Sequence, residues 1–360
     1  MESVTNLHKP MSSFKINGTL VGTGLEPYCI AEVGINHNGD FDLAKKMIDV
    51  AKDSGADAVK FQTFTASEFC IDDSQQFSYF SQGKEVTESM LKMFSRYEFK
   101  KHQWAELKNY ADEINITFLS TPQNKKDLGL LLEIGMTAIK IGSDDFTNIP
   151  LIRSYAAANL PIILSCGMSD LAEVKLALET VGWRRGHEVI LLVCTSQYPT
   201  PIQDANIRRL ETLRKLFPEL ILGFSDHTQG FLAATCAVAL GACVFEKHFT
   251  LDNSFPGPDH WFSANPVDLR EWISAIKQSV LTLGSPEIEP TIEEQSMRTM
   301  ARRSVFATSS IAIGDEFSEK NIDVRRPGGG LPPIYMDEIL GLKATRDIKS
   351  GTPLEKGDFV

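Results

Sequence analysis

The sequence predicts a (β/α)8 barrel, the TIM-barrel fold, followed by a small β-rich domain. The first observation behind this prediction is a series of eight short, apolar, β-branched runs, each followed by a stretch with a helical pattern. The second is the length of the series, since the span from Glu26 to Gly284 is normal for such a barrel. The third is a change of composition past Leu283, where this alternation stops. Eight alternations fit a closed barrel better than an open, doubly wound sheet.

The eight predicted strands are hydrophobic along their length rather than at alternate positions, which is typical of parallel strands buried on both faces. They are Tyr28–Val33, Ala58–Gln62, Thr117–Thr121, Ala138–Ser143, Ile162–Gly167, Val189–Thr195, Ile221–Asp226 and Cys243–Phe249. Amphipathic stretches between them predict helices. Four of these helices are predicted over Phe41–Asp53, Lys101–Glu113, Leu171–Val181 and Phe231–Leu240.

The patterns predict three segments: a barrel domain over residues 1–284, a linker over 285–300 and a small domain over 301–360. The linker prediction rests on the stretch Gly284–Glu294, which is rich in proline and glutamate. The small domain contains strand-like runs such as Ser304–Ala307 and Ile322–Arg326. Two similar phrases, Ile311–Asp315 and Ile348–Thr352, indicate two related turns within it. So small a domain gains stability by docking.

Composition indicates an ordinary globular protein, with 42% hydrophobic and 23% charged residues. A net charge of −11 argues against a nucleic-acid partner, because phosphate backbones select basic surfaces. No apolar run reaches the length of a membrane span, and residues 1–10 lack the apolar core of a signal peptide. We therefore expect a cytoplasmic protein with no membrane partner. The six cysteines form no C-x-x-C pair, which favours buried free thiols over disulfides or a zinc cluster.

Polar residues stand at the carboxyl end of nearly every predicted strand. In a barrel these ends meet at one face, where the active site is assembled. A polar residue at one strand end means little, but polar residues at nearly every end predict a shared pocket. The residues are Glu32, Lys60, Gln62, Thr121, Lys140, Ser143, Ser165, Thr195, Ser225, Asp226, Lys247 and His248.

Two histidines, His227 and His248, follow Asp226 and Lys247 at equivalent positions of neighbouring strands. Each histidine taken alone is best interpreted as a structural residue. As a pair at adjacent strand ends, they can direct neutral imidazole nitrogens to one divalent metal. Only two protein ligands, completed by water and substrate, suit an ion such as Mn²⁺ or Mg²⁺ better than a closed zinc site.

Two lysines, Lys60 and Lys140, lie at strand ends together with several hydroxyl side chains. The hydroxyls are those of Ser143, Ser165, Thr195, Ser196 and Ser225. Ammonium groups among hydroxyl donors are typical of a site for phosphate and carboxylate groups. One alternative is a lysine whose stem lies along apolar surface while its charge reaches solvent. Another is a lysine that forms a Schiff base with a carbonyl substrate.

Three loops carry further candidates. Glu32 opens a turn-rich loop, where its carboxylate can orient a hydroxylated substrate or move a proton, whereas Asp40 is better placed to cap the next helix. His37 in the same loop is interpreted as a packing residue. Asp259, in the loop after the last strand, is a candidate contact for substrate hydroxyls. Arg326 lies in a basic turn of the small domain that is either solvated or a clamp over a site.

The residues at these positions resemble the bacterial sialic acid synthase family, whose members make N-acetylneuraminate, legionaminate or pseudaminate. The resemblance covers almost the whole chain in the family's own order, and residues from Arg302 resemble the antifreeze-like (SAF) domain that follows the barrel. The matching motifs are Ala31–Gly39, Lys60–Thr63, Ser120-Thr121-Pro122, Lys140–Ser143, Leu164–Met168, Gly223–His227, Glu246–Phe249 and Pro256–Asp259. The last of these motifs favours the sialate and legionaminate branches over the pseudaminate branch.

The resemblance implies a transferase that condenses phosphoenolpyruvate with the open-chain form of an N-acylated mannosamine-type sugar and releases phosphate by C–O cleavage. It implies N-acetylneuraminate as the product, with legionaminate or pseudaminate as alternatives. A divalent metal, Mn²⁺ or Mg²⁺, is implied at His227 and His248. A domain-swapped homodimer is also implied, in which Arg326 of one chain reaches the sugar bound to the other.

The resemblance also implies a role for each candidate residue. Lys60, Thr121, Lys140, Ser143, Ser165, Ser196 and Ser225 match the positions that hold phosphoenolpyruvate. Glu32, Asp145, Tyr198, Asp259 and Arg326 match positions that face the sugar. Glu32, Lys60, Gln62 and Asp259 match positions at the reacting centre.

Three positions depart from the sialate branch of the family. Asp145 stands where that branch has a glutamate, Ser196 where it has an asparagine, and Val193 where it has a histidine. A shorter carboxylate at Asp145 reaches a different part of the sugar. Two other interpretations remain: a Schiff-base pyruvate aldolase on the same barrel, and a non-enzymatic sugar-binding or antifreeze-like module. The second leaves the polar strand ends unexplained.

Overall fold

The computed structural model describes residues 12–360, and the chain divides into two compact units, Met1–Gly284 and Ser285–Val360. Residues 1–10, on which the signal-peptide expectation rests, and Met11 lie outside the described residues. Each unit has a hydrophobic core of its own. The two units are therefore described separately.

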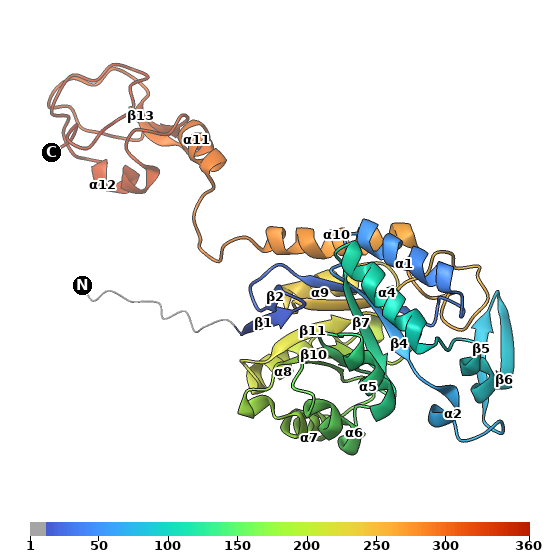
Figure 1. Cartoon of the computed structure of the whole chain (residues 1–360). Coiled ribbons are helices and arrows are strands. Elements are labelled where there is room, and N and C mark those ends of the chain that lie inside the picture. The colour runs from blue at the N-terminus through green and yellow to red at the C-terminus, as the bar shows by residue number, and fades with distance from the viewer. Residues whose placement is uncertain (1–11) are drawn as a thin grey trace. The chain divides into compact units, whose positions relative to one another are not determined.

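The first unit is a barrel of eight parallel strands, which confirms the predicted fold class (Figure 1). Hydrogen bonds join the strands in the order β7-β4-β3-β12-β11-β10-β9-β8, and β7 and β8, the two ends of this order, lie beside each other. The strands are β3 (Tyr28–Gly34), β4 (Ala58–Thr63), β7 (Thr117–Pro122), β8 (Ile139–Ile141), β9 (Ile162–Ser165), β10 (Val189–Cys194), β11 (Ile221–Ser225) and β12 (Val244–His248).

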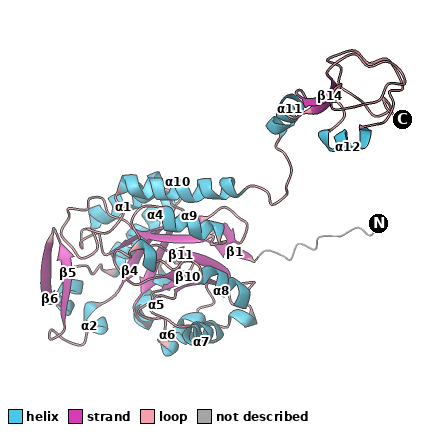
Figure 2. Ribbon diagram, turned by 180° about the vertical axis from the view of Figure 1, so that it is seen from behind, coloured by secondary structure: helices cyan, strands magenta, loops and turns pink. Residues whose placement is uncertain are grey.

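Helices surround the strands, as the alternating pattern predicts (Figure 2). They are α1 (Phe41–Asp53), α4 (Lys101–Glu113), α5 (Lys125–Glu133), α6 (Ile149–Ala156), α7 (Leu171–Val181), α8 (Arg209–Leu216), α9 (Leu232–Ala239) and α10 (Pro266–Leu283), with 3-10 turns at Trp183–Arg185 and Ile202–Asp204. Three of the four predicted helices have the predicted bounds, and the fourth is one residue shorter at each end. Asp40 caps α1 by accepting from the Leu43 amide at 3.0 Å, as predicted.

Several predicted strands end earlier than the apolar pattern indicates. The strand predicted over Ala138–Ser143 is a ladder only over Ile139–Ile141, and that over Ile162–Gly167 ends at Ser165. In both cases the small residues that follow, Gly142-Ser143 and Cys166-Gly167, leave the ladder and form the loops at the carboxyl ends of the strands. Polar residues at strand ends thus belong partly to loops, which affects where their side chains point.

The barrel unit has two apolar layers, because alternate residues of each strand face opposite sides. One layer lies between the strands and the helices and includes Val59, Phe118 and Leu191. The other fills the barrel interior near the amino ends of the strands and includes Ile30, Leu119 and Ile163. Both faces of the strands are therefore buried, which explains their continuous hydrophobicity.

Two hairpins that the sequence did not reveal complete the barrel unit. The hairpin of β1 (Ser13–Ile16) and β2 (Thr19–Gly22) adds apolar side chains to the interior layer and so closes the amino end of the barrel. The hairpin of β5 (Gln76–Ser81) and β6 (Lys84–Ser89) lies between β4 and α4 in sequence, with the short helices α2 (Ala66–Phe69) and α3 (Met90–Ser95) beside it. The two hairpins lie on opposite sides of the barrel (Figure 1).

The second unit contains α11 (Ile292–Ala301), β13 (Ser304–Ala307), β14 (Ile322–Arg325), a 3-10 turn at Pro333–Tyr335 and α12 (Met336–Ile339). Helix α11 occupies the second half of the segment predicted as a linker, residues 285–300. A capping box, in which Thr291 and Glu294 bond reciprocally to each other's backbone, starts this helix. The two similar phrases of this unit contact each other, since Ile311 and Ile348 form an antiparallel bridge.

Two further expectations concern the cysteines and the membrane. Cys29, Cys70, Cys194 and Cys243 are buried free thiols, as predicted, whereas Cys166 is half-buried and Cys236 is exposed. Among residues 12–360, no helix combines the length and the apolar character that a membrane span requires.

Candidate active site

The carboxyl ends of the strands open into a cavity of about 580 Å³. Most of the residues predicted to form the site line this cavity. They are Glu32, Lys60, Gln62, Thr121, Lys140, Ser143, Ser165, Ser196, Tyr198, Ser225, His227, His248 and Asp259. The predicted shared pocket thus exists, and the side chains come from all eight strands or the loops that follow them.

The strand register explains why these side chains share one space. Lys60 lies two residues after Ala58, and Lys140 two residues after Ala138; both alanines belong to the interior apolar layer. Because side chains alternate along a strand, each lysine also points into the barrel, one step nearer its carboxyl end. The interior is therefore apolar at the amino end and polar at the carboxyl end.

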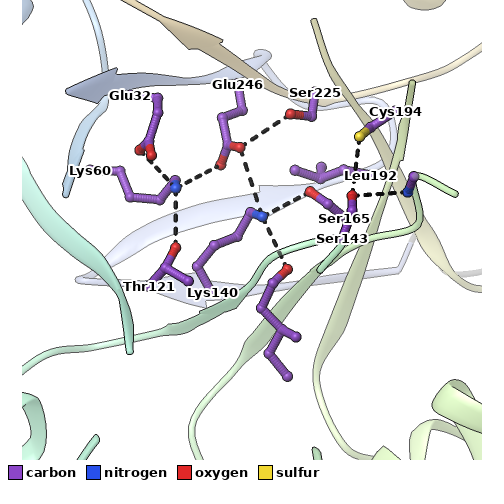
Figure 3. Close-up of polar contacts among 12 residues, drawn as sticks. Glu32, Lys60, Thr121, Lys140, Ser143, Ser165, Leu192, Cys194, Ser225 and Glu246 are labelled. Atoms are coloured by element: carbon purple, nitrogen blue, oxygen red, sulfur yellow. Dashed lines mark hydrogen bonds and ion pairs between the residues drawn. The ribbon is translucent and has the colours of Figure 1, made fainter. Parts of the chain in front are cut away.

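Lys60 is the centre of the first half of a buried ion network at the cavity floor (Figure 3). Its Nζ lies 2.7 Å from Glu32 Oε2 and 3.6 Å from Glu246 Oε2, and it donates to Thr121 Oγ1 at 3.2 Å. Gln62 Nε2 donates to the other oxygen of Glu32 at 3.2 Å. The Glu32 carboxylate is thus held between an ammonium and an amide.

Lys140 is the centre of the second half of this network (Figure 3). Its Nζ donates to Ser165 Oγ at 2.8 Å and to the Ile141 carbonyl at 3.1 Å, and lies 3.7 Å from Glu246 Oε1. Ser225 Oγ donates to the same Glu246 oxygen at 3.2 Å. Glu246 therefore bridges the two lysines and places two ammonium groups side by side.

Burial and charge shift the pKa of each member of the network in a definite direction. Burial raises the pKa of Glu32, whereas Lys140 and Lys60 hold the pKa of Glu246 low against its own burial. Burial opposes the charge of Lys60, but Glu246 and Glu32 raise its pKa above the ordinary value. Burial lowers the pKa of Lys140 in spite of Glu246. Lys60 is thus a fixed cation, and Glu32 is the carboxylate that takes up a proton more readily.

The hydroxyls beside Lys140 are packed around Gly167. The Gly167 amide donates to Ser143 Oγ at 3.0 Å, and Ser143 Oγ lies 3.3 Å from Cys194 Sγ. Ser196 Oγ is buried without a hydrogen-bond partner. A buried hydroxyl that lacks a protein partner and lines the cavity is a ready donor to a bound anion.

His227 and His248 lie beside this floor, with ring centroids 5.6 Å apart. His227 Nδ1 lies 2.8 Å from the Thr195 carbonyl, which can only accept, so Nδ1 carries the proton and Nε2 keeps its lone pair. His248 Nδ1 is buried without a partner. Burial lowers the pKa of both rings, and His227 lowers that of His248 further. Both rings are therefore neutral donors that fit a divalent metal.

No group of three or more His, Cys, Asp or Glu side chains is arranged as a metal site within residues 12–360. The histidine pair therefore fits an ion that takes its remaining ligands from water and substrate.

Gly34 allows the close approach of the groups around it: a Cβ there would lie 3.3 Å from Glu32 Oε1 and 3.7 Å from His248 Cε1.

Asp226 and Lys247 lie at the same two strand ends but point away from the cavity. Each is one residue after an inward side chain, so alternation turns it toward the helices. Asp226 Oδ2 accepts from Lys247 Nζ at 3.1 Å and from Trp272 Nε1 of α10 at 2.8 Å. This buried ion pair joins the backbones that carry the two histidines. Thr195 also leaves the cavity, since its hydroxyl donates to the Asp204 carbonyl.

Tyr198 and Asp259 stand near the histidines at the cavity wall. The Tyr198 ring lies 4.2 Å from that of His227, and burial raises the pKa of its phenol. Burial also raises the pKa of Asp259 to about 7, so its carboxyl group can carry a proton near neutrality. His37 packs on Phe99 with ring centroids 4.4 Å apart, in agreement with its interpretation as a packing residue.

Two further predicted residues, Asp145 and Arg326, are not among those that line the cavity. Asp145 accepts from the Asn148 side chain at 2.9 Å, and its neighbour Asp144 lines the cavity instead. Arg326 belongs to the second unit. Glu246 was missed by the sequence analysis. Its position two residues before His248 could have revealed it, because alternation turns both side chains to the same side.

Comparison with known proteins agrees with this arrangement. Residues 47–287 match the model of the NeuB family, and residues 302–360 match that of the SAF domain. The chain belongs to the NeuB family. The NeuB match spans the strands of the barrel from β4 onward and most of the cavity, and the resemblance noted in the sequence is thereby confirmed.

Individual relatives of this NeuB-family chain are synthases. The chain is 37% identical to N,N'-diacetyllegionaminic acid synthase of Legionella pneumophila, over 95% of this chain and 98% of the relative. It is 40% identical to the protein of the same name from Campylobacter jejuni, over 89% and 96%. The crystal structure of N-acetylneuraminic acid synthetase from Leptospira borgpetersenii superposes with a TM-score of 0.72 at 33% identity, covering 81% of this chain and 96% of that one. The protein is therefore an enzyme of a family that includes sialic and legionaminic acid synthases.

Proposed function

We propose that the protein condenses phosphoenolpyruvate with the open-chain form of an N-acylated mannosamine-type sugar to give a nonulosonic acid and phosphate. The observation that carries this proposal is the pair of buried ammonium groups of Lys60 and Lys140, set among hydroxyls beside two neutral histidines. An anion with phosphate and carboxylate groups fits the first feature. An aldehyde that must be activated fits the second.

Phosphoenolpyruvate binds at the cavity floor in this proposal. Lys60 and Lys140 supply charge to its phosphate and carboxylate groups. The hydroxyls of Thr121, Ser143, Ser165, Ser196 and Ser225 supply neutral donors around them. Because the floor already holds equal numbers of lysines and glutamates, binding a further anion favours protonation of Glu32, whose pKa is raised in advance.

The sugar aldehyde lies beside His227 and His248, and the methylene carbon of phosphoenolpyruvate attacks the aldehyde carbon. A new C–C bond forms, water adds to the resulting cationic C2, and the C–O bond to phosphate breaks. Glu32 and Asp259 move the protons that these steps require, at the alkoxide oxygen and at the attacking water. Gln62 holds Glu32 in place, and Tyr198 packs against the sugar.

The two histidines would hold a divalent metal, Mn²⁺ or Mg²⁺. When bound, such an ion polarises the aldehyde oxygen and orients water. His227 presents its Nε2 lone pair because the Thr195 carbonyl fixes the tautomer. The chain itself thus determines which nitrogen faces the substrate.

Identity favours the legionaminate branch as the finer assignment. The two legionaminic acid synthases share 37% and 40% identity with the chain, against 36% for a pseudaminic acid synthase and 33% for an N-acetylneuraminate-9-phosphate synthase. The preferred sugar is then a 2,4-diacetamido-trideoxymannose rather than N-acetylmannosamine.

We also propose that Arg326 contacts the sugar from the SAF domain of a partner chain, in a domain-swapped homodimer. The protein is proposed to act in the cytoplasm.

Phosphate release tests the proposal. We expect phosphate to appear only when phosphoenolpyruvate and an amino sugar are both present, to stop after EDTA treatment and to return with Mn²⁺. Mass spectrometry should show a product whose mass is that of the amino sugar plus pyruvate. Phosphate release that proceeds equally well without any sugar would contradict condensation.

A Schiff-base aldolase is the second candidate, and the lowered pKa of Lys140 favours it, because a neutral amine is the nucleophile. Borohydride treatment separates the two functions. The aldolase would be trapped as a covalent adduct on Lys140 and would resist EDTA. The condensation proposed here leaves the lysine unmodified.

Gly167→Ala is expected to weaken phosphoenolpyruvate binding. An added Cβ would lie 2.4 Å from Ser196 Oγ, 2.7 Å from Ser143 Oγ and 2.9 Å from Cys194 Sγ, so the two hydroxyls must move. A displacement of this size lowers kcat/KM by roughly 10- to 100-fold. Steady-state kinetics with each substrate in turn should show a higher KM for phosphoenolpyruvate and little change for the sugar. An equal rise in both would contradict a role confined to the anion.

A further inference from the structure

A continuous row of aromatic rings lines one wall of the cavity. The row begins at His227, whose ring lies 4.2 Å from Tyr198, and Tyr198 lies 5.2 Å from Phe262. Phe262 lies 5.6 Å from Trp261, which in turn lies 6.0 Å from Phe80 of β5. The proposed chemistry gives roles to His227 and Tyr198 at one end of this row. It assigns none to Trp261 and Phe80 at the other end.

The far end of the row comes from two loops that are tied together. Phe80 belongs to the β5–β6 hairpin, and Trp261 to the connection between β12 and α10. Gln82 of the hairpin turn donates to the Ser254 carbonyl at 2.9 Å, and the Gly257 amide donates to Ser81 Oγ at 3.0 Å. The hairpin that the sequence did not reveal is therefore fixed against the loop that carries Trp261.

These rings are exposed to the cavity in a way that suits an apolar ligand group. Phe80 is 50% exposed and Trp261 41% exposed, and both line the cavity. Large aromatic side chains that gather at the rim of a cavity are typical of a binding surface. Aromatic faces pack well against methyl groups and against the acetyl groups of amino sugars.

The charges along the cavity exclude a strongly anionic sugar at this end. Among the described residues that line the cavity, the lysines are Lys60 and Lys140, and there is no arginine. Both lysines lie in the ion network of the floor. Asp144 also lines the cavity and adds a negative charge. A C6 phosphate at the Phe80 and Trp261 end would therefore meet aromatic rings where it needs cations.

We infer that Phe80 and Trp261 form a specificity surface for the end of the sugar remote from its aldehyde. The surface selects a 6-deoxy sugar with acylated amino groups over one with a C6 hydroxyl, and it rejects a C6 phosphate. The inference rests on the proposed function, which places the aldehyde at His227 and His248. The remaining carbons then extend along the aromatic row toward Trp261. The surface acts on the sugar and leaves phosphoenolpyruvate untouched.

The test compares three sugars on the full-length enzyme with Mn²⁺: a 2,4-diacetamido-trideoxymannose, N-acetylmannosamine and N-acetylmannosamine 6-phosphate. We expect the parent to prefer the first sugar over the second by roughly 10- to 100-fold in kcat/KM, as apolar pockets do for a group of this size. Trp261→Ala and Phe80→Ala should each reduce this preference by about 10-fold and leave the KM for phosphoenolpyruvate unchanged. Trp261→Phe and Phe80→Leu should retain most of it.

Phe231→Ala is the matched control, because Phe231 is 45% exposed and does not line the cavity. It should keep the parental preference. An unchanged preference in both Trp261→Ala and Phe80→Ala, or a parent that favours either hydroxylated or phosphorylated sugar, would overturn this inference alone. A parent that releases phosphate with none of the sugars would overturn the proposed function as well.

Discussion

Lys140→Met is expected to lower kcat/KM for phosphoenolpyruvate by roughly 10²- to 10³-fold, the size of effect that follows removal of one preorganised donor to an anionic site. Methionine keeps the length and the apolar stem of lysine but removes the ammonium that contacts Ser165 and Glu246. The floor then carries two carboxylates and one ammonium, so a further anion is repelled. Stopped-flow or steady-state phosphate release, together with phosphoenolpyruvate binding measured calorimetrically, checks the result.

Lys108→Met is the matched control for this substitution. Lys108 is also a buried lysine in an ion pair, with Asp112, but it lies on α4 and does not line the cavity. We expect its variant to bind phosphoenolpyruvate as the parent does. If Lys140→Met bound phosphoenolpyruvate with parental affinity while its melting curve stayed parental, the assignment of Lys140 to the anion would be wrong.

The barrel could be predicted because its signal is local and repeated. Each strand is a continuous apolar run, since both faces are buried, and several of the helices that follow begin at a side-chain cap, as α1 does at Asp40. The polar strand ends could be predicted for the same reason: a barrel brings all its carboxyl strand ends to one face. Thirteen of the predicted site residues therefore line one cavity.

The parts that could not be predicted depend on contacts between distant segments. Phe80 and Trp261 are far apart in sequence, and their meeting depends on hydrogen bonds between the hairpin turn and a loop. Asp144 lines the cavity where Asp145 was predicted to, and this depends on how the short loop after β8 turns. Asp226 was predicted at the cavity because it stands at the end of the predicted strand Ile221–Asp226, but it points away from the cavity. Strand alternation separates it from His227.

The buried pair of Asp226 and Lys247 gives the largest expected effect on stability. Their side chains are 0% and 6% exposed, and Asp226 also accepts from Trp272 and from the backbone and hydroxyl of Thr228. Lys247→Met leaves the carboxylate without its cation, and Asp226→Asn leaves the ammonium without its anion. Either variant should lose about 3–5 kcal/mol in the free energy of unfolding, because an uncompensated buried charge remains.

The double variant distinguishes a lost ion pair from a packing defect. Asp226→Asn with Lys247→Met removes both charges, so it should be less destabilised than the sum of the two single variants. Tryptophan fluorescence in urea is the measurement, since the four tryptophans, Trp104, Trp183, Trp261 and Trp272, all lie in the barrel unit and report on it alone. Lys126→Met, which removes an exposed ion pair with Glu68, should leave the free energy of unfolding close to that of the parent. If Lys247→Met cost no more than this control, the pair would not hold the histidine-bearing strand ends together.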